Sequence, residues 1–189
     1  HNDVAGIFRD DTTALHQRIS RSQNDDAIVT ISTHDSTPDF TSFNGDSARS
    51  DIPNNESGLV WGNNNIASDD FSLNGLTNTP FGESLSGTKR WSRVWYTQAT
   101  NFTEHVNIQF ESPFIGNNEN YIFYLITETD GDGDFSNDGV VENEGSPSFA
   151  QNGIVIFENV DLNNKYFTIA RQEYKPMRHG KKFLNSKEQ

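Results

Sequence analysis

Hydrophobic and polar residues alternate along several short stretches of the chain. In Ala27–Thr33 and His105–Ser112 apolar residues recur at about every second position, the pattern of a strand with one buried face. Val106, Ile108 and Phe110 of the second stretch are therefore expected to point into the core. Both stretches predict half-buried β-strands.

Other stretches are apolar at nearly every position. Tyr121–Thr127 and Gly153–Val160 are flanked by Asn, Gly and Asp, which predicts strands in the middle of a packed sheet. Shorter candidates are Gly58–Gly62, Arg90–Gln98 and Lys165–Arg171. No convincing amphipathic helix is found between them. Short strands separated by long loops rich in Asn, Ser, Asp and Gly predict an all-β fold, an antiparallel β-sandwich.

Length, charge and composition narrow the classes of protein. The chain of 189 residues is long enough for one domain with a single core, and 12% of it is aromatic. Its formal net charge of -13 disfavours nucleic acid and anionic membranes as partners. No apolar run approaches the length of a membrane-spanning helix, so we expect no membrane insertion. The absence of cysteine excludes disulfides and thiolate metal sites.

The segment 129–139, TDGDGDFSNDG, concentrates negative charge in one loop. Neither a helix nor a strand favours Asp and Gly at this density, whereas Ca²⁺ takes about six to eight oxygen ligands. The predicted ligands are Asp130, Asp132, Asp134 and Asp138, with Asn137 or a backbone carbonyl completing the shell. Phe135 and Val141 occupy the positions where an EF-hand requires Gly and Glu, so a calcium loop on another scaffold is predicted. The alternative is a solvated acidic turn.

Catalysis finds little support in the sequence. The five His residues are scattered, without H-E-x-x-H or H-x-H spacing. Segment 82–87, GESLSG, has Ser86 where a nucleophile elbow requires Gly. No constellation unites a nucleophile, a base and an orienting group, so we expect no catalytic residues and no enzyme activity.

Several sequence blocks, in this order, resemble a known family. They are NDVAGIFRDDTTALHQRISRS, AIVTI, GLVWGNN, KRWSRVWYTQ, YLITETDGDGDFSNDG and KYFTIARQE, and they span residues 2–173. They resemble a calcium-dependent all-β domain of large bacterial surface proteins, similar to the peptide-binding domain of RTX adhesins. The resemblance implies a β-sandwich with several Ca²⁺ ions and a calcium-assisted pocket for the C-terminal end of a partner peptide. It also implies that Asp10 and Asp11 help to ligate calcium.

Candidate ligand-binding residues lie at the ends of predicted strands. Trp61, Trp91 and Trp95 are expected mainly in the core, because aromatic rings supply much of the buried area of a sandwich. Asn residues after Trp61 offer amide groups where binding loops gather, and Arg93 can grip a carboxylate with two hydrogen bonds or merely neutralise the acidic surface. The predicted ligand pocket consists of Trp61, Asn63, Asn64, Arg93 and Tyr96.

The last sixteen residues, YKPMRHGKKFLNSKEQ, differ from the rest of the chain. They carry five Lys or Arg residues against one Glu and resemble the segment that follows such domains in cargo of the type IX secretion system. We therefore expect a ligand-binding domain at 1–173 and, at 174–189, a basic linker toward a missing C-terminal sorting region. This resemblance implies a secreted or cell-surface protein of a Gram-negative bacterium.

Three functions follow from these patterns. The first is a calcium-dependent adhesion module that binds an extracellular peptide or protein C-terminus. The second is a carbohydrate-binding module, in which Ca²⁺ fixes sugar hydroxyls and exposed aromatic rings stack on the sugar. The third is a calcium-stiffened spacer in a long surface protein. In each case we expect a monomeric module within a larger chain.

Overall fold

The computed structural model describes residues 2–35, 40, 49–66, 73–74, 88–115, 121–128, 130–135, 140–145 and 152–173. Strands and turns account for the regular structure of these residues, which include no helix. Every strand pair is antiparallel. The part of the chain that the structure describes therefore has no apolar helix of membrane-spanning length. The predicted all-β sandwich class is confirmed.

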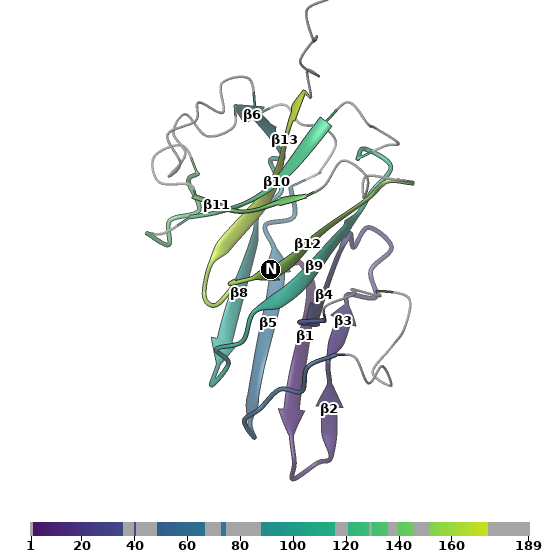
Figure 1. Ribbon diagram of the computed structural model, residues 1–189, viewed down its shortest axis with the longest axis vertical. Helices are drawn as coiled ribbons and strands as arrows, with labels where there is room; N and C mark the ends of the chain where they lie inside the picture. Colours follow the sequence, from purple (N-terminus) through teal and green to yellow (C-terminus); the bar gives the residue numbers. More distant parts are fainter. Residues whose placement is uncertain are drawn as a thin grey trace, which may run out of the picture.

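The strands form two sheets (Figure 1). The large sheet contains β1 (Asn2–Asp10), β2 (Leu15–Gln17), β5 (Ser57–Asn63), β6 (Leu73–Asn74), β7 (Lys89–Arg90), β8 (Trp95–Thr100), β10 (Tyr121–Thr127), β11 (Val140–Gly145) and β13 (Tyr166–Glu173). Its order is β11-β10-β13-β8-β5-β1-β2, and β7 joins β6 to β13. The small sheet contains β3 (Ile19–Arg21), β4 (Val29–Thr33), β9 (Val106–Glu111) and β12 (Ile154–Val160), in the order β12-β9-β4-β3.

The two sheets are linked by a segment that belongs to both. Only Arg18 separates β2, which pairs with β1 in the large sheet, from β3, which pairs with β4 in the small one. Arg18 donates hydrogen bonds from Nη1 to the carbonyl oxygen of Arg49 (3.0 Å) and to Asp51 (3.2 Å). The chain thus changes sheets at a residue whose side chain is held by a distant loop.

The core lies between the sheets and is rich in aromatic rings. Phe110 of β9 meets Trp95 edge to face at 5.5 Å between ring centroids, and Trp95 stacks on Phe167 of β13 at 5.7 Å. Such pairs add about 0.5–1.5 kcal/mol each to the energy of burial. Trp61, Trp91 and Trp95 are all buried, as predicted. The inward orientation predicted for Val106, Ile108 and Phe110 is also confirmed.

Most predicted strands are present, with three corrections. β4 and β9 were expected to be half-buried, but every residue of both strands except Glu111 is buried, so both of their faces are covered. β10 has the predicted bounds, whereas the single strand predicted at Arg90–Gln98 is divided into β7 and β8. The carbonyl oxygens of Arg93 and Val94 bond to the hydroxyl of Thr168 and to the N–H of Asn64, not to a neighbouring strand's ladder. β12 was expected in the middle of a sheet but is the end strand of the small sheet's order.

Candidate functional site

An acidic loop follows β10 and contains a cluster of carboxylates. Oxygen atoms of Glu128, Asp130 and Asp132 all lie within 4.8 Å of one another. Glu128 is buried, with 2% of its surface exposed, whereas Asp130 and Asp132 face solvent. The cluster thus has one ligand anchored in the fold and two at the surface.

Backbone hydrogen bonds wrap the loop around the Glu128 carboxylate. Its Oε2 accepts the N–H groups of Asp132 (3.0 Å) and Gly133 (2.9 Å). Asp132 Oδ1 in turn accepts the N–H of Asp134 at 2.6 Å. Gly131 and Gly133 have φ angles of 84° and 79°, a left-handed conformation that glycine adopts without a Cβ penalty. The glycines of the motif are therefore needed for the turn itself.

Phe135 holds the loop against the outer face of the large sheet. Its side chain is buried in a small cluster with Tyr124, Ile126 and Ala170, separate from the core between the sheets. The guanidinium of Arg90 lies over the ring, 5.3 Å from the centroid. The position that an EF-hand would give to Gly is here an apolar anchor, which explains why this loop departs from that motif.

The electrostatics of Glu128 favour a cation. Burial raises the pKa of its carboxyl group; the N–H groups of Gly133 and Asp132 act in the opposite direction, and the adjacent Asp130 raises the pKa further. Oε1 is buried and has no hydrogen-bond partner among the described residues. A buried carboxylate oxygen without a partner is unfavourable, and a hard divalent cation among these oxygen ligands would compensate it.

A hollow of about 220 Å³ lies directly beside this cluster. It is lined by Gly62, Asn64, Val94, Tyr96, Asp132, Gly133 and Tyr166. The rings of Tyr96 and Tyr166 are 4.6 Å apart between centroids and tilted by 44°. An exposed carboxylate of the cluster and an aromatic pair thus share one concave surface.

The predicted metal ligands are not all in this cluster. Asp130 and Asp132 belong to it, and Asp134 follows in the same loop. Asn137 and Asp138 lie outside the described residues. Asp10 ends β1 and Asp11 begins the turn to β2, and this turn lies at the far end of the large sheet (Figure 1).

The acidic side chains at the turn between β1 and β2 are hydrogen-bonded to neighbouring residues of the same turn. Asp10 accepts hydrogen bonds from the hydroxyl of Thr13 (2.8 Å) and the N–H of Thr12 (2.9 Å), which lower its pKa. Asp11 is bonded by Arg9 at 2.8 Å, which likewise lowers its pKa. These contacts account for both Asp residues as components of a turn.

The predicted ligand residues separate into two groups. Asn64 and Tyr96 line the hollow beside the acidic loop. Trp61, Asn63 and Arg93 are 2%, 1% and 5% exposed, respectively. The expectation of direct ligand contact does not agree with the burial of Trp61 and Asn63, and Arg93 lines a different hollow.

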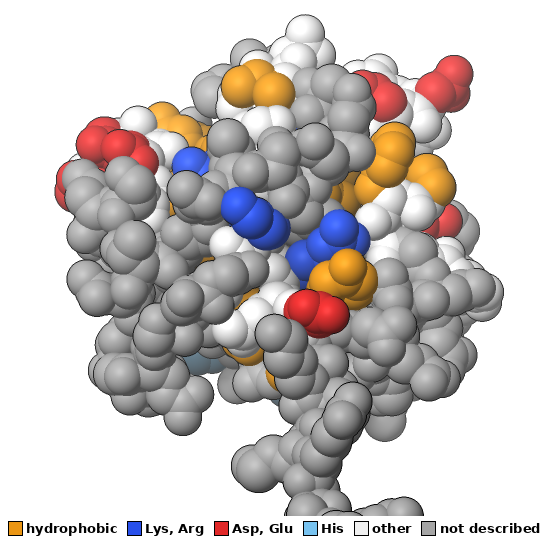
Figure 2. Space-filling model, turned by 90° about the horizontal axis from the view of Figure 1, so that it is seen from above, with side chains coloured by type: hydrophobic (Ala, Val, Ile, Leu, Met, Phe, Trp, Pro, Cys, Tyr) orange, Lys and Arg blue, Asp and Glu red, His pale blue; other side chains and the backbone are white. Residues whose placement is uncertain are grey.

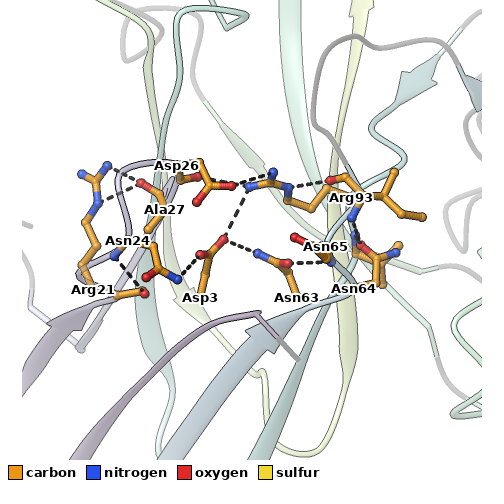
Figure 3. A network of polar contacts seen from close by, with 12 residues as sticks. Asp3, Arg21, Asn24, Asp26, Ala27, Asn63, Asn64, Asn65 and Arg93 are labelled. Carbon is orange, nitrogen blue, oxygen red and sulfur yellow. Dashed lines mark hydrogen bonds and ion pairs between the residues drawn. The ribbon is translucent and has the colours of Figure 1, made fainter.

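Arg93 and Asn63 belong instead to a buried polar network (Figure 3). The carboxylate of Asp3 accepts hydrogen bonds from Asn63 (2.5 Å) and Asn24 (2.8 Å) and lies 3.6 Å from Arg93 Nη1. Arg93 also donates to the carbonyl oxygens of Ile66 (2.8 Å) and Asp26 (3.1 Å). Arg93 does grip carboxylates, but they belong to the chain itself, and the network ties β1, β5 and two loops together.

Two residues of the site were not predicted. Glu128 extends the alternation of acidic residues to Glu128, Asp130, Asp132 and Asp134, and this spacing was a usable signal. No sequence pattern marks Tyr166 as a site residue, because only the pairing of β13 with β8 brings it to the hollow beside the acidic loop.

The fold and the acidic loop define a class of protein, an antiparallel β-sandwich with an oxygen-rich candidate cation centre on its outer face. The chain belongs to the DUF8202 family, a domain of unknown function, whose model matches residues 1–166. No curated protein and no solved structure matches the chain.

Proposed function

We propose that this domain is a non-catalytic, calcium-dependent ligand-binding module. Ca²⁺ is held by Glu128, Asp130 and Asp132, and the ligand occupies the hollow beside them. The observation that carries the proposal is the buried Glu128 carboxylate. One of its oxygens has no hydrogen-bond partner among the described residues, and it forms a cluster within 4.8 Å with Asp130 and with Asp132, which lines that hollow.

The chemistry of the ligands selects the ion. The cluster offers only oxygen atoms, which suit hard cations, and Ca²⁺ accepts the irregular geometry of a loop more readily than Mg²⁺ does. Three carboxylates leave part of a shell of about six to eight ligands open to backbone carbonyls, water or a bound molecule. Asp134, Asn137 and Asp138 are proposed as further contributors. Asp130 and Asp132 are exposed, so the open positions face solvent.

The setting proposed for the module is the surface of a Gram-negative cell. An extracellular space supplies Ca²⁺ at millimolar levels, which even the weaker calcium sites of extracellular modules can use. The resemblance to adhesin domains and the basic segment at 174–189 support a secreted or surface-anchored parent chain with a role in adhesion. Both expected ligands, a peptide carboxylate and a sugar diol, offer oxygen atoms that can take an open coordination position on Ca²⁺.

Isothermal titration of the metal-free domain with Ca²⁺ tests the proposal. We expect saturable binding that Asp132→Asn weakens at least about tenfold, because the variant removes one charged ligand from the cluster. Asp11→Asn serves as the matched control, since it removes one acidic charge from the turn between β1 and β2. Equal calcium affinity in all three proteins, or no binding to the wild-type domain, would refute the proposed centre.

A further inference from the structure

The hollow is built on one row of residues that crosses four neighbouring segments. Gly62 of β5 is paired with Tyr96 of β8, and Tyr96 with Tyr166 of β13. The N–H of Glu128 then donates to the carbonyl oxygen of Tyr166 at 3.3 Å. The row therefore runs from Gly62, which has no side chain, across the rings of Tyr96 and Tyr166 to Glu128 of the carboxylate cluster.

The aromatic rings are open enough to meet a ligand and are fixed in place. Tyr96 and Tyr166 are both half-buried, and each is a cross-strand neighbour of the other. A Cβ atom on Gly133 would lie 3.7 Å from the Tyr166 ring, so the acidic loop packs against that ring. Rigid aromatic faces at a pocket stack on flat apolar surfaces at little cost in conformational entropy.

The charge around the hollow selects the ligand class. One Ca²⁺ on the three carboxylates of the cluster leaves one net negative charge, and further acidic ligands would add to it. None of the described residues that line the hollow is Lys or Arg. A ligand carboxylate would add a second negative charge that no Lys or Arg among the described lining residues offsets, whereas neutral hydroxyl groups enter the open coordination positions without adding charge.

The two Arg residues that line a larger hollow are paired with acidic residues. A larger hollow of about 650 Å³ is lined by Arg21 and Arg93, but Arg21 pairs with Glu111 at 2.5 Å and Arg93 with Asp26 at 3.4 Å. In the β7–β13 register Lys89 lies opposite Arg171. Figure 2 shows Lys and Arg side chains gathered in the middle of the face seen from above, with one acidic side chain close beside them and further Asp and Glu nearer the margins.

We infer that the module binds a neutral saccharide, and this inference rests on the calcium centre proposed above. Two vicinal hydroxyl groups of the sugar take open positions on the Ca²⁺, and the apolar face of the sugar ring lies against Tyr96 and Tyr166. A volume of about 220 Å³ is below the roughly 300–1,000 Å³ of pockets for drug-sized ligands, which suits one sugar ring at the end of a glycan.

The test compares neutral sugars with peptides on the full 189-residue chain. The probes are methyl α-mannopyranoside, methyl β-galactopyranoside and methyl α-fucopyranoside, together with one peptide that ends in a free carboxylate and its amidated copy. Each is titrated by calorimetry in millimolar Ca²⁺ and again in EDTA. The variants are Tyr96→Ala and, as a control for the loss of an aromatic ring at another place, the exposed Phe114→Ala.

We expect at least one glycoside to bind in Ca²⁺ and not in EDTA. Tyr96→Ala should weaken that binding about tenfold while its affinity for Ca²⁺ stays unchanged, and Phe114→Ala should match the wild type. If the domain binds Ca²⁺ but binds the free-carboxylate peptide, or binds none of these probes, the saccharide assignment is overturned and the metal centre stands. Absence of calcium binding would instead overturn the centre itself.

Discussion

Replacing Glu128 by Gln should affect the calcium-free and the calcium-loaded domain in opposite directions. The substitution keeps the shape of the side chain and an oxygen for the N–H groups of Asp132 and Gly133. It removes a buried negative charge that lies beside Asp130. It also replaces an oxygen without a hydrogen-bond partner among the described residues by an NH₂ group that can donate to the Asp130 carboxylate. The same charge is the buried ligand of the proposed Ca²⁺ centre, so its loss should remove most of the stabilisation by calcium.

The two effects have different magnitudes. In EDTA, relief of the buried oxygen should raise the free energy of unfolding of the variant by about 1 kcal/mol, the lower end of the cost of an unsatisfied buried polar group. In the wild-type domain, Ca²⁺ at 100 times its dissociation constant should add about 2.7 kcal/mol. For a domain of this size that corresponds to a rise in Tm of about 5–11 °C.

Thermal unfolding followed by circular dichroism measures both effects. We expect the variant to melt at or above the wild-type temperature in EDTA, and well below it in saturating Ca²⁺. Glu111→Gln, which removes an exposed Glu that pairs with Arg21, is the matched control and should keep the full calcium shift. A Glu128→Gln variant that retains the calcium shift, or that is less stable than the wild type in EDTA, would refute the reasoning.

Three further predictions concern the fold around the site. Arg93→Ala should lower the free energy of unfolding, measured in urea, by about 3–5 kcal/mol, because it leaves the buried Asp3 carboxylate without its cation. The control Arg21→Ala, at an exposed ion pair, should lower the free energy of unfolding by about 1 kcal/mol or less. Equal losses in the two variants would contradict this prediction. Phe135→Ala should lower the free energy of unfolding by about 3–5 kcal/mol and weaken calcium binding measured by calorimetry. An unchanged affinity for Ca²⁺ would show that the loop does not need Phe135 as an anchor. Deletion of residues 174–189 should leave the Tm nearly unchanged, and a large loss would show that this segment packs on the sandwich.

Local pattern was enough to predict most of the strands. β10 was predicted with its observed bounds, and Val106, Ile108 and Phe110 were assigned to the core by alternation alone. Alternation is a property of neighbouring residues, so it can be read without knowing the partner strand. β1 was not predicted, because Asp3, Gly6 and its charged end obscure the apolar positions.

The acidic loop shows how far sequence reasoning reaches toward the site. Its composition predicted a cation site at Asp130 and Asp132, and the structure places these residues in one cluster with Glu128. Burial of Glu128 decides that one ligand is anchored in the fold, and packing of Phe135 holds the loop against the outer face of the sheet. No local pattern contains that packing.

The hollow beside the loop was decided by tertiary structure. Four residues around the hollow are distant in the chain: Gly62, Tyr96, Glu128 and Tyr166. They become neighbours because β5, β8 and β13 are adjacent in the sheet and because Glu128 follows β10. Arg93 illustrates the same limit, because its burial with Asp3 arises from a contact across 90 residues. The sequence by itself determined the strands and the acidic loop, since both depend on residues close together in the chain. Strand order, which depends on packing between distant segments, decided which side chains line the hollow and which lie in the interior.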